Sequence, residues 1–439
     1  MMNTQDKYIL ERKTRLKYQF LRLKTGIYEV THKKSCAIIA ITYIIVTLLI
    51  WVISKVTATE VVDIFTLFKH VVFQLLYPLY AIAGFIVLLV LLGTPKGARA
   101  INENLWRIGL TNHAGEAPLL LRKYKQNKEF SVVIMEFEPN GVSISEWQDK
   151  QERIETALNV HIIKFEQGTS KRRILLYTVS GDEGLPKTVY WKKEYLSEED
   201  FTLIFGYSMT GQVNINLAKI PHILLGGSTG SGKSVLLKLL IMQCVKKNAD
   251  VFIADFKGGV DFLPAWHEKC NIITEENRLL EVLTELVNEL EHRKELLRNS
   301  GYANIGEYNN ANENKLKRLI FACDEVAEVL DKTGLLKDAK ELVTKIEGKL
   351  SVIARQGRAF GIHLILATQR PDANILTGQI RNNIDFRVCG RADNVLSQII
   401  LDNTEAADKI PKESQGLFIT HDGVVFQGYL FDEKAVFEE

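Results

Sequence analysis

The sequence predicts an α/β protein built on a mostly parallel sheet, preceded by a smaller α/β subdomain and two helices able to cross a membrane. Three observations predict this fold class. From about residue 201, apolar strands alternate with helical stretches, as in a parallel sheet with crossover helices. A glycine-rich turn joins one of these strands to a helix, and two long apolar runs lie near the N-terminus. With 439 residues, 46% of them hydrophobic, the chain can form two or three folded units.

The two apolar runs predict a transmembrane hairpin. Residues 36–53 form an uncharged run of 18, and residues 71–92 form a second apolar run of 22. Each can cross a hydrocarbon core of about 30 Å as a helix, whereas helices buried in a soluble core usually carry a polar face. Residues 1–35 hold nine Lys or Arg against three acidic residues, so the positive-inside rule puts both chain ends in the cytoplasm. This basic leader can also lie on anionic lipid, or do no more than set the topology.

The expected organisation has six segments. They are a basic cytoplasmic leader (1–35), a first transmembrane helix (36–54), a short extracytoplasmic loop (55–70), a second transmembrane helix (71–93), a membrane-proximal α/β subdomain (94–200) and a large α/β domain (201–439). The subdomain shows strand patterns at 130–137, 160–165 and 173–179 and a helical pattern at 145–158. It carries no recognisable catalytic constellation, so a spacer or assembly role is the simplest interpretation.

Charge and cysteine content exclude some classes of protein. The net charge of the whole chain is only +2, so the overall charge does not indicate a nucleic-acid-binding protein. The five cysteines form no CxxC pair, which excludes a zinc ribbon and argues against a disulfide framework.

The large domain is expected to contain strands at 222–225, 251–254, 319–323, 363–367, 386–389 and 424–431, with helices at 234–246 and 275–298. The first strand and the first helix flank a turn that fits G-x-x-x-x-G-K-[ST]. Its residues are Gly227, Ser228, Thr229, Gly230, Ser231, Gly232, Lys233 and Ser234. Glycines let main-chain N–H groups surround phosphate oxygens at a helix N-terminus. Lys233 can reach the β- and γ-phosphates and Ser234 can ligate Mg²⁺, so ATP and Mg²⁺ are the expected cofactors.

Polar residues end two later strands. Asp324 and Glu325 follow the strand at 319–323. An acid at this place holds the Mg²⁺ shell in P-loop ATPases, a role assigned to Asp324, and Glu325 is then placed to orient the attacking water as a general base. Gln369 ends the strand at 363–367 and is a candidate γ-phosphate sensor, although a simple strand-end hydrogen bond is an alternative.

These segments together resemble the motor of the FtsK/SpoIIIE family, from about residue 205 to residue 401. The longest similar stretches are residues 216–225, 358–371 and 375–384. The resemblance implies a RecA-like P-loop NTPase fold, a homo-hexameric ring with nucleotide at the subunit interfaces, and DNA threaded through the pore. It also implies an arginine that reaches the phosphates of the neighbouring subunit. Arg387 and Arg358 are the candidates, with Arg391 behind them, and each can instead be a surface ion pair.

The layout is similar to that of FtsK-like conjugative coupling proteins of Gram-positive mobile elements. We expect no DNA-reading winged helix after the motor, because few residues follow the strand expected at 424–431, and the predicted anchor has two spans. Such proteins link DNA and its relaxase to transfer-channel proteins, which the resemblance implies as partners. Two alternatives stay open: an ATPase of type VII-like protein export, and a membrane docking platform for relaxase and DNA with slow ATP turnover.

A basic segment follows the second acidic motif. Residues 332–358 contain seven Lys or Arg against three acids, and such groups lining a pore would bind phosphates without reading bases. A solvated helix face is the alternative. Other candidates for the pore are Phe262, Trp266, Lys257 and residues 372–383.

Overall fold

The computed structural model describes residues 4–57, 64–125, 132–182, 184–258, 261–369 and 378–434. The chain divides into two compact units, Met1–Gly184 and Leu185–Glu439. The boundary expected at residue 200 therefore falls earlier. The reason is that residues after Gly184 already belong to the second unit, where β5 (Val189–Tyr190) pairs with β15 (Val425–Leu430).

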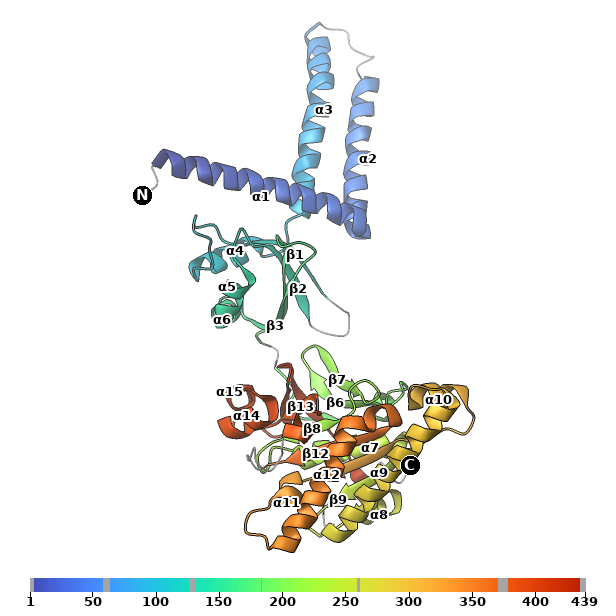
Figure 1. Cartoon of the computed structure of the whole chain (residues 1–439). Helices are drawn as coiled ribbons and strands as arrows, with labels where there is room; N and C mark the ends of the chain where they lie inside the picture. Colours follow the sequence, from blue (N-terminus) through green and yellow to red (C-terminus); the bar gives the residue numbers. More distant parts are fainter. Residues whose placement is uncertain are drawn as a thin grey trace. The chain divides into compact units, whose positions relative to one another are not determined.

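The first unit begins with three helices, α1 (Thr4–His32), α2 (Lys34–Thr57) and α3 (Ile64–Leu92). Two stretches within them, Lys34–Val56 and Phe68–Leu92, are long and apolar enough to cross a membrane, and only 6% of each is buried in the protein. Figure 1 shows α2 and α3 side by side as a hairpin, with α1 crossing its base. The expected loop at 55–70 lies partly outside the described residues, and α3 starts within it. The leader, predicted from its charge alone, is a long helix.

Helix α1 is fixed against the C-terminal end of α3 by two glycines. A Cβ atom on Gly26 would lie 1.8 Å from the carbonyl oxygen of Leu89, and one on Gly93 would lie 2.0 Å from that of Arg22. Arg22 is only 1% exposed, and its guanidinium donates hydrogen bonds to the carbonyls of Gly93 (3.3 Å) and Leu121 (3.2 Å). Only glycine permits so close a crossing, so the position of α1 on α3 is specific.

A small α/β domain completes the first unit. Its antiparallel sheet has the order β1-β2-β4-β3, formed by β1 (Leu119–Lys125), β2 (Val133–Glu138), β3 (Val160–Gln167) and β4 (Ile174–Ser180). Three helices complete the domain: α4 (Ala98–Arg107), α5 (Ile144–Asp149) and α6 (Gln151–Leu158). Leu105, Phe137 and Trp147 are fully buried in its core. The single helix expected at 145–158 is two helices, because Lys150 leaves the helical region (φ −106°, ψ 16°).

The second unit is built on one large mixed sheet, with the strand order β10-β9-β11-β12-β8-β13-β14-β15-β6-β7. The strands are β6 (Thr202–Ser208), β7 (Gly211–Asn216), β8 (Ile223–Gly226), β9 (Asp250–Ala254), β10 (Asn271–Ile273), β11 (Leu319–Cys323), β12 (Ile362–Thr368), β13 (Phe386–Cys389) and β14 (Leu417–Thr420), with β15 as above. From β10 to β13 all neighbours are parallel, and from β13 to β7 all are antiparallel. The parallel half is the half that the sequence predicts.

Helices accompany this sheet along the second unit. They are α7 (Lys233–Lys246), α8 (Pro264–Lys269), α9 (Glu276–Ser300), α10 (Ile305–Ala311), α11 (Val326–Leu330), α12 (Lys337–Phe360), α13 (Gly378–Arg381), α14 (Asn394–Leu401) and α15 (Glu405–Lys409), with a 3-10 turn η2 (Lys193–Tyr195) before β6.

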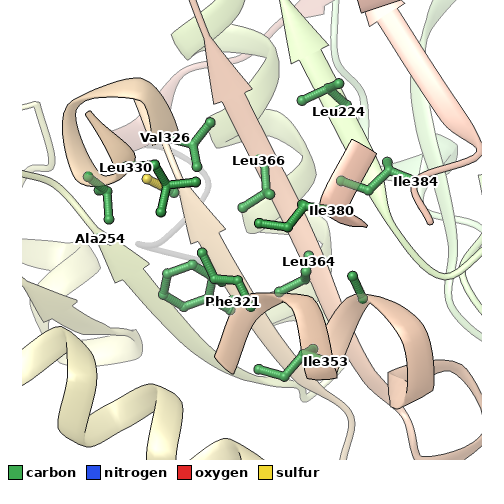
Figure 2. Close-up of a cluster of buried hydrophobic side chains, with 14 of the residues drawn as sticks. Leu224, Ala254, Phe321, Val326, Leu330, Ile353, Leu364, Leu366, Ile380 and Ile384 are labelled. Atoms are coloured by element: carbon green, nitrogen blue, oxygen red, sulfur yellow. The ribbon is translucent and has the colours of Figure 1, made fainter. Parts of the chain in front are cut away.

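The core lies on both faces of this sheet. In β11, Phe321 joins one hydrophobic cluster, drawn in Figure 2, while its neighbours Ile320 and Ala322 join the other. In β12, Leu364 and Ile365 divide in the same way. Strands buried on both faces read as continuous apolar runs, which is why these strands are visible in the sequence. Their parallel direction brings the carboxyl ends of β8, β9, β11 and β12 to one edge.

Candidate nucleotide site

The glycine-rich turn forms a loop between β8 and α7 at this edge. Gly227, Gly230 and Gly232 have positive φ angles of 158°, 77° and 96°, which other residues rarely adopt. Gly232 is the N-cap of α7 in the left-handed conformation, and a Cβ atom there would lie 3.1 Å from the main-chain nitrogen of Gly416. The loop therefore presents its main chain at the N-terminus of a 14-residue helix, an arrangement that favours bound phosphate.

Main-chain hydrogen bonds tie the loop to the segments after β13 and before β14. They run from Gly390 N to Gly226 O (2.9 Å), from Ser228 N to Arg391 O (2.7 Å) and from Gly416 N to Ser231 O (2.8 Å). The guanidinium of Arg391 also donates to the carbonyls of Thr229 and Lys412 (2.5 and 2.7 Å). Arg391 therefore braces the loop of its own chain.

Asp324 lies at the centre of the site, at the end of β11, and is 3% exposed. Its Oδ1 atom accepts hydrogen bonds from Lys233 Nζ and Ser234 Oγ, both at 2.9 Å, and its Oδ2 atom accepts one from Lys257 Nζ at 3.0 Å. Burial raises the pKa of this carboxyl, but the charge of Lys233 and the hydrogen bonds from the three donors outweigh it, so the pKa is lowered. Asp324 is therefore ionised and directly linked to the phosphate loop.

These oxygens fit a magnesium ion that also binds phosphate. Ser234 Oγ and Asp324 Oδ1 converge to 2.9 Å. Mg²⁺ in nucleotide sites takes one or two such protein oxygens and completes its shell with phosphate oxygens and water. Among the described residues no group of three or more His, Cys, Asp or Glu could hold a metal by itself. The arrangement suits a metal that arrives with a nucleotide.

Glu325 is held by the neighbouring strand. It is 5% exposed, its Oε1 atom accepts a hydrogen bond from Thr368 Oγ1 (2.6 Å), and its Oε2 atom accepts one from the main-chain nitrogen of Gln369 (2.9 Å). The side chain of Gln369 in turn accepts a hydrogen bond from Thr229 Oγ1 (2.8 Å). The end of β12 thus connects the candidate base to the phosphate loop.

The two candidate arginines make contacts elsewhere. Arg387 donates to Asp402 and to the carbonyls of Ile384 and Arg381. Arg358 is exposed near the end of α12, and among the described residues it donates one long hydrogen bond, 3.4 Å, to the carbonyl of Ala218. Neither makes a recorded contact with the described residues of the site of its own chain, so a role across a subunit interface stays a prediction for both.

Two residues of the site were missed or placed vaguely by sequence reasoning. Lys257 binds Asp324 and also Asp261 (3.4 Å). Burial lowers its pKa, but the hydrogen bond to Asp324 and the two carboxylate charges outweigh it, so the pKa is raised. Asp255, 2% exposed, accepts the main-chain N–H of Lys257 at Oδ1, while its Oδ2 has no partner among the described residues. The signal was Asp255-Phe-Lys257 directly after β9, the strand beside β11.

The pore candidates have mixed outcomes. Phe262 and Trp266 are buried, at 4% and 0% exposed, in the core beside α7, so the expectation that they face a lumen is wrong. Of residues 372–383, the part up to 377 lies outside the described residues. On and before α12, Lys332 pairs with Glu347 (2.7 Å) and Lys345 with Glu341 (2.8 Å). The exposed basic residues of the helix are Lys337, Lys340, Lys345, Arg355 and Arg358.

The fold and the site define a P-loop nucleotide-binding protein of the α/β class. Residues 188–373 match the model of the FtsK/SpoIIIE family. The chain is also similar to a solved structure of the pCW3 conjugation coupling protein TcpA in a monomer form with ATPγS, at 37% identity and a TM-score of 0.57, over 78% of this chain and 97% of that one. This chain belongs to the FtsK/SpoIIIE family.

Curated relatives agree with this assignment. The DNA translocase FtsK of Chlorobaculum tepidum is 34% identical over 218 residues, which cover 46% of this chain and 26% of that protein. The DNA translocase FtsK of Campylobacter jejuni is 29% identical over 294 residues, covering 62% and 30%. This chain thus spans between a quarter and a third of the length of these relatives.

Proposed function

We propose that this protein is a membrane-anchored, ATP-driven DNA translocase that acts as a coupling protein, delivering DNA to a conjugative transfer channel. One observation carries the motor assignment: Asp324 binds Lys233 and Ser234 of the phosphate loop while Glu325, the next residue, is separately held by β12. The coupling role is supported by the likeness to TcpA across nearly the whole of that chain.

The proposed roles follow from the contacts. Lys233 would bind the β- and γ-phosphates in place of Asp324. Ser234 and Asp324 would hold Mg²⁺, which would neutralise phosphate charge when bound. Glu325 orients the attacking water and accepts its proton, because its carboxylate is fixed by two donors. Gln369 reports the state of the γ-phosphate, since it already contacts the phosphate loop through Thr229.

The remaining proposals concern assembly and placement. The protein forms a homo-hexameric ring in which Arg387 or Arg358 reaches the nucleotide of a neighbour, and exposed basic residues of α12 contact DNA phosphates without reading sequence. Helices α2 and α3 anchor it as a two-pass protein of the cell membrane with both termini in the cytoplasm. A relaxase and channel proteins are the expected partners.

DNA-dependent ATP hydrolysis tests this proposal. The full-length chain in lipid nanodiscs should hydrolyse ATP faster with double-stranded or single-stranded DNA, and Lys233→Ala should abolish the activity. Lys246→Ala, at the other end of the same helix, is the matched control and should behave as wild type. A rate of ATP hydrolysis that neither DNA changes would favour protein export, and negligible ATP turnover by the wild type would favour a docking platform. Either result would overturn the translocase.

A further inference from the structure

In the membrane placement proposed above, helix α1 lies where both spans leave the bilayer. It ends at His32, and α2 begins two residues later at Lys34. Six residues before that end, Gly26 contacts the last turn of α3 at Leu89. Gly26 and Lys34 are thus about 12 Å apart along the chain at 1.5 Å per helical residue, and each meets a different span where that span ends. A helix with two such points runs across the ends of both spans, and Figure 1 shows α1 crossing the base of the α2–α3 hairpin.

One side of α1 faces the small α/β domain. Three contacts among the described residues are Lys17 Nζ to Asn140 Oδ1 (3.0 Å), Arg22 to the carbonyl of Leu121 (3.2 Å), and the ring of Tyr28 under the guanidinium of Arg122 (4.5 Å from carbon to ring centroid). This domain follows α3 directly in the chain. In the proposed topology it lies on the cytoplasmic side.

The opposite side of α1 carries an apolar ridge. Leu16, Phe20, Leu23 and Ile27 follow the spacing i, i+4, i+7, i+11 of one helix face. At about 100° per residue, this ridge lies roughly opposite the side that contacts the small domain. Leu16, Phe20 and Ile27 are 58%, 68% and 50% exposed, and Leu23 is half-buried. Single exposed apolar residues are ordinary, but a continuous exposed ridge marks an interaction surface.

We propose that α1 is an interfacial helix, whose ridge inserts between the headgroups and acyl chains of the bilayer that α2 and α3 cross. The ridge points away from the small domain and therefore toward the membrane. Lys24, on the flank of α1, and Lys96 and Arg99, just after α3, are exposed, and such basic residues beside the spans favour anionic headgroups. The inference rests on the membrane placement proposed above. It adds that α1, through Arg22, fixes the orientation of the small domain relative to the membrane.

Lipid quenching of a probe on the ridge tests the proposal. The full-length chain, with Cys36→Ser to remove its partly exposed thiol, takes Phe20→Cys labelled with the fluorophore NBD. It is placed in vesicles of phosphatidylcholine with phosphatidylglycerol, brominated either near the headgroup end or near the methyl end of the acyl chains. Ile45→Cys, exposed within α2, is the membrane control, and Glu152→Cys, exposed on α6, is the aqueous control.

The probe at residue 20 should be quenched most by bromine near the headgroups, and more strongly when phosphatidylglycerol is present than in phosphatidylcholine alone. The probe at residue 45 should be quenched by both lipids, and that at residue 152 by neither. Quenching at 45 but not at 20 would overturn the inference and leave the anchor intact. No quenching at either position would remove the anchor and the inference together. Self-quenching of the probe at residue 20 that grows with the density of labelled chains, without quenching by bromine, would show that a second copy of the chain covers the ridge. That result would also overturn the inference.

Discussion

The hydroxyl of Thr368 offers a sharp test of how Glu325 is held. Thr368→Val keeps the shape of the side chain and removes the 2.6 Å hydrogen bond to Oε1 of a carboxylate that is only 5% exposed. The second oxygen keeps its bond from the main-chain nitrogen of Gln369. The substitution therefore removes one of the two hydrogen bonds that hold the proposed general base.

The expected loss can be worked from these contacts. A hydrogen bond to a charged group contributes about 1.5–3 kcal/mol, which corresponds to about 10- to 150-fold in rate at about 1.4 kcal/mol per factor of ten. Because the main-chain donor remains, we expect the lower part of this range, a decrease in kcat of about 10- to 30-fold. The phosphate loop keeps its own contacts, so KM for ATP should change by less than about twofold.

Steady-state ATP hydrolysis by the full-length chain, with saturating DNA and Mg²⁺, measures both constants. Thr178→Val is a matched control, since Thr178 is also a buried strand residue, 1% exposed, whose hydroxyl donates to a main-chain carbonyl (3.0 Å) outside the motor. That variant should keep the kcat of wild type. A kcat for Thr368→Val within twofold of wild type would refute the view that Thr368 positions Glu325 for the reaction.

Three further outcomes follow from the second unit. Within α12, Gly348→Ala meets no atom within 4 Å and should stabilise by up to about 1 kcal/mol. Gly357→Ala would put its Cβ 2.2 Å from a carbonyl oxygen and should cost about 1–3 kcal/mol; thermal melting of the two variants should shift in opposite directions. Burial lowers the pKa of His222 from 6.5 to about 4. The neutral ring therefore contributes up to about 3 kcal/mol of stability that is present above pH 6.5 and is lost as the pH falls to 4. The melting temperature of His222→Gln should depend less on pH in that window. Lys257→Met removes a cation that competes with Mg²⁺ for Asp324 and should lower the Mg²⁺ concentration for half-maximal nucleotide binding by about two- to fivefold, whereas an unchanged Mg²⁺ titration would contradict this competition.

The predictable part of the fold is the part with local patterns. Strands β11 and β12 read as unbroken apolar runs because both of their faces are buried, and the phosphate loop is a contiguous motif. The antiparallel half was not predicted as a sheet. Strand β6 pairs with β15, which lies more than 200 residues away in the chain, and Gly206 sits there against the carbonyl of Gln427, where a Cβ atom would lie 2.1 Å away. Such pairing depends on the whole chain and leaves little local signal.

The candidate site divides in the same way. That Lys233, Ser234 and Asp324 meet was expected, because the carboxyl ends of parallel strands share an edge. The contact between Lys257 and Asp324 was not expected, because a lysine after a strand belongs to no motif. That Asp324 is its partner follows only from the position of β9 beside β11. The apolar ridge of α1 could have been predicted from the spacing of its apolar residues, but the leader was interpreted from its charge alone.

The bracing of the phosphate loop has a consequence for how the loop responds to movement of the sheet. Three of its links, to Gly390, Arg391 and Gly416, use main-chain atoms, and the guanidinium of Arg391 adds a side-chain link to the carbonyl of Thr229. Any sliding of β13 or β14 would therefore displace the main chain of the phosphate loop directly. The antiparallel half of the sheet is thus coupled to the phosphate loop through the backbone of two short connecting segments.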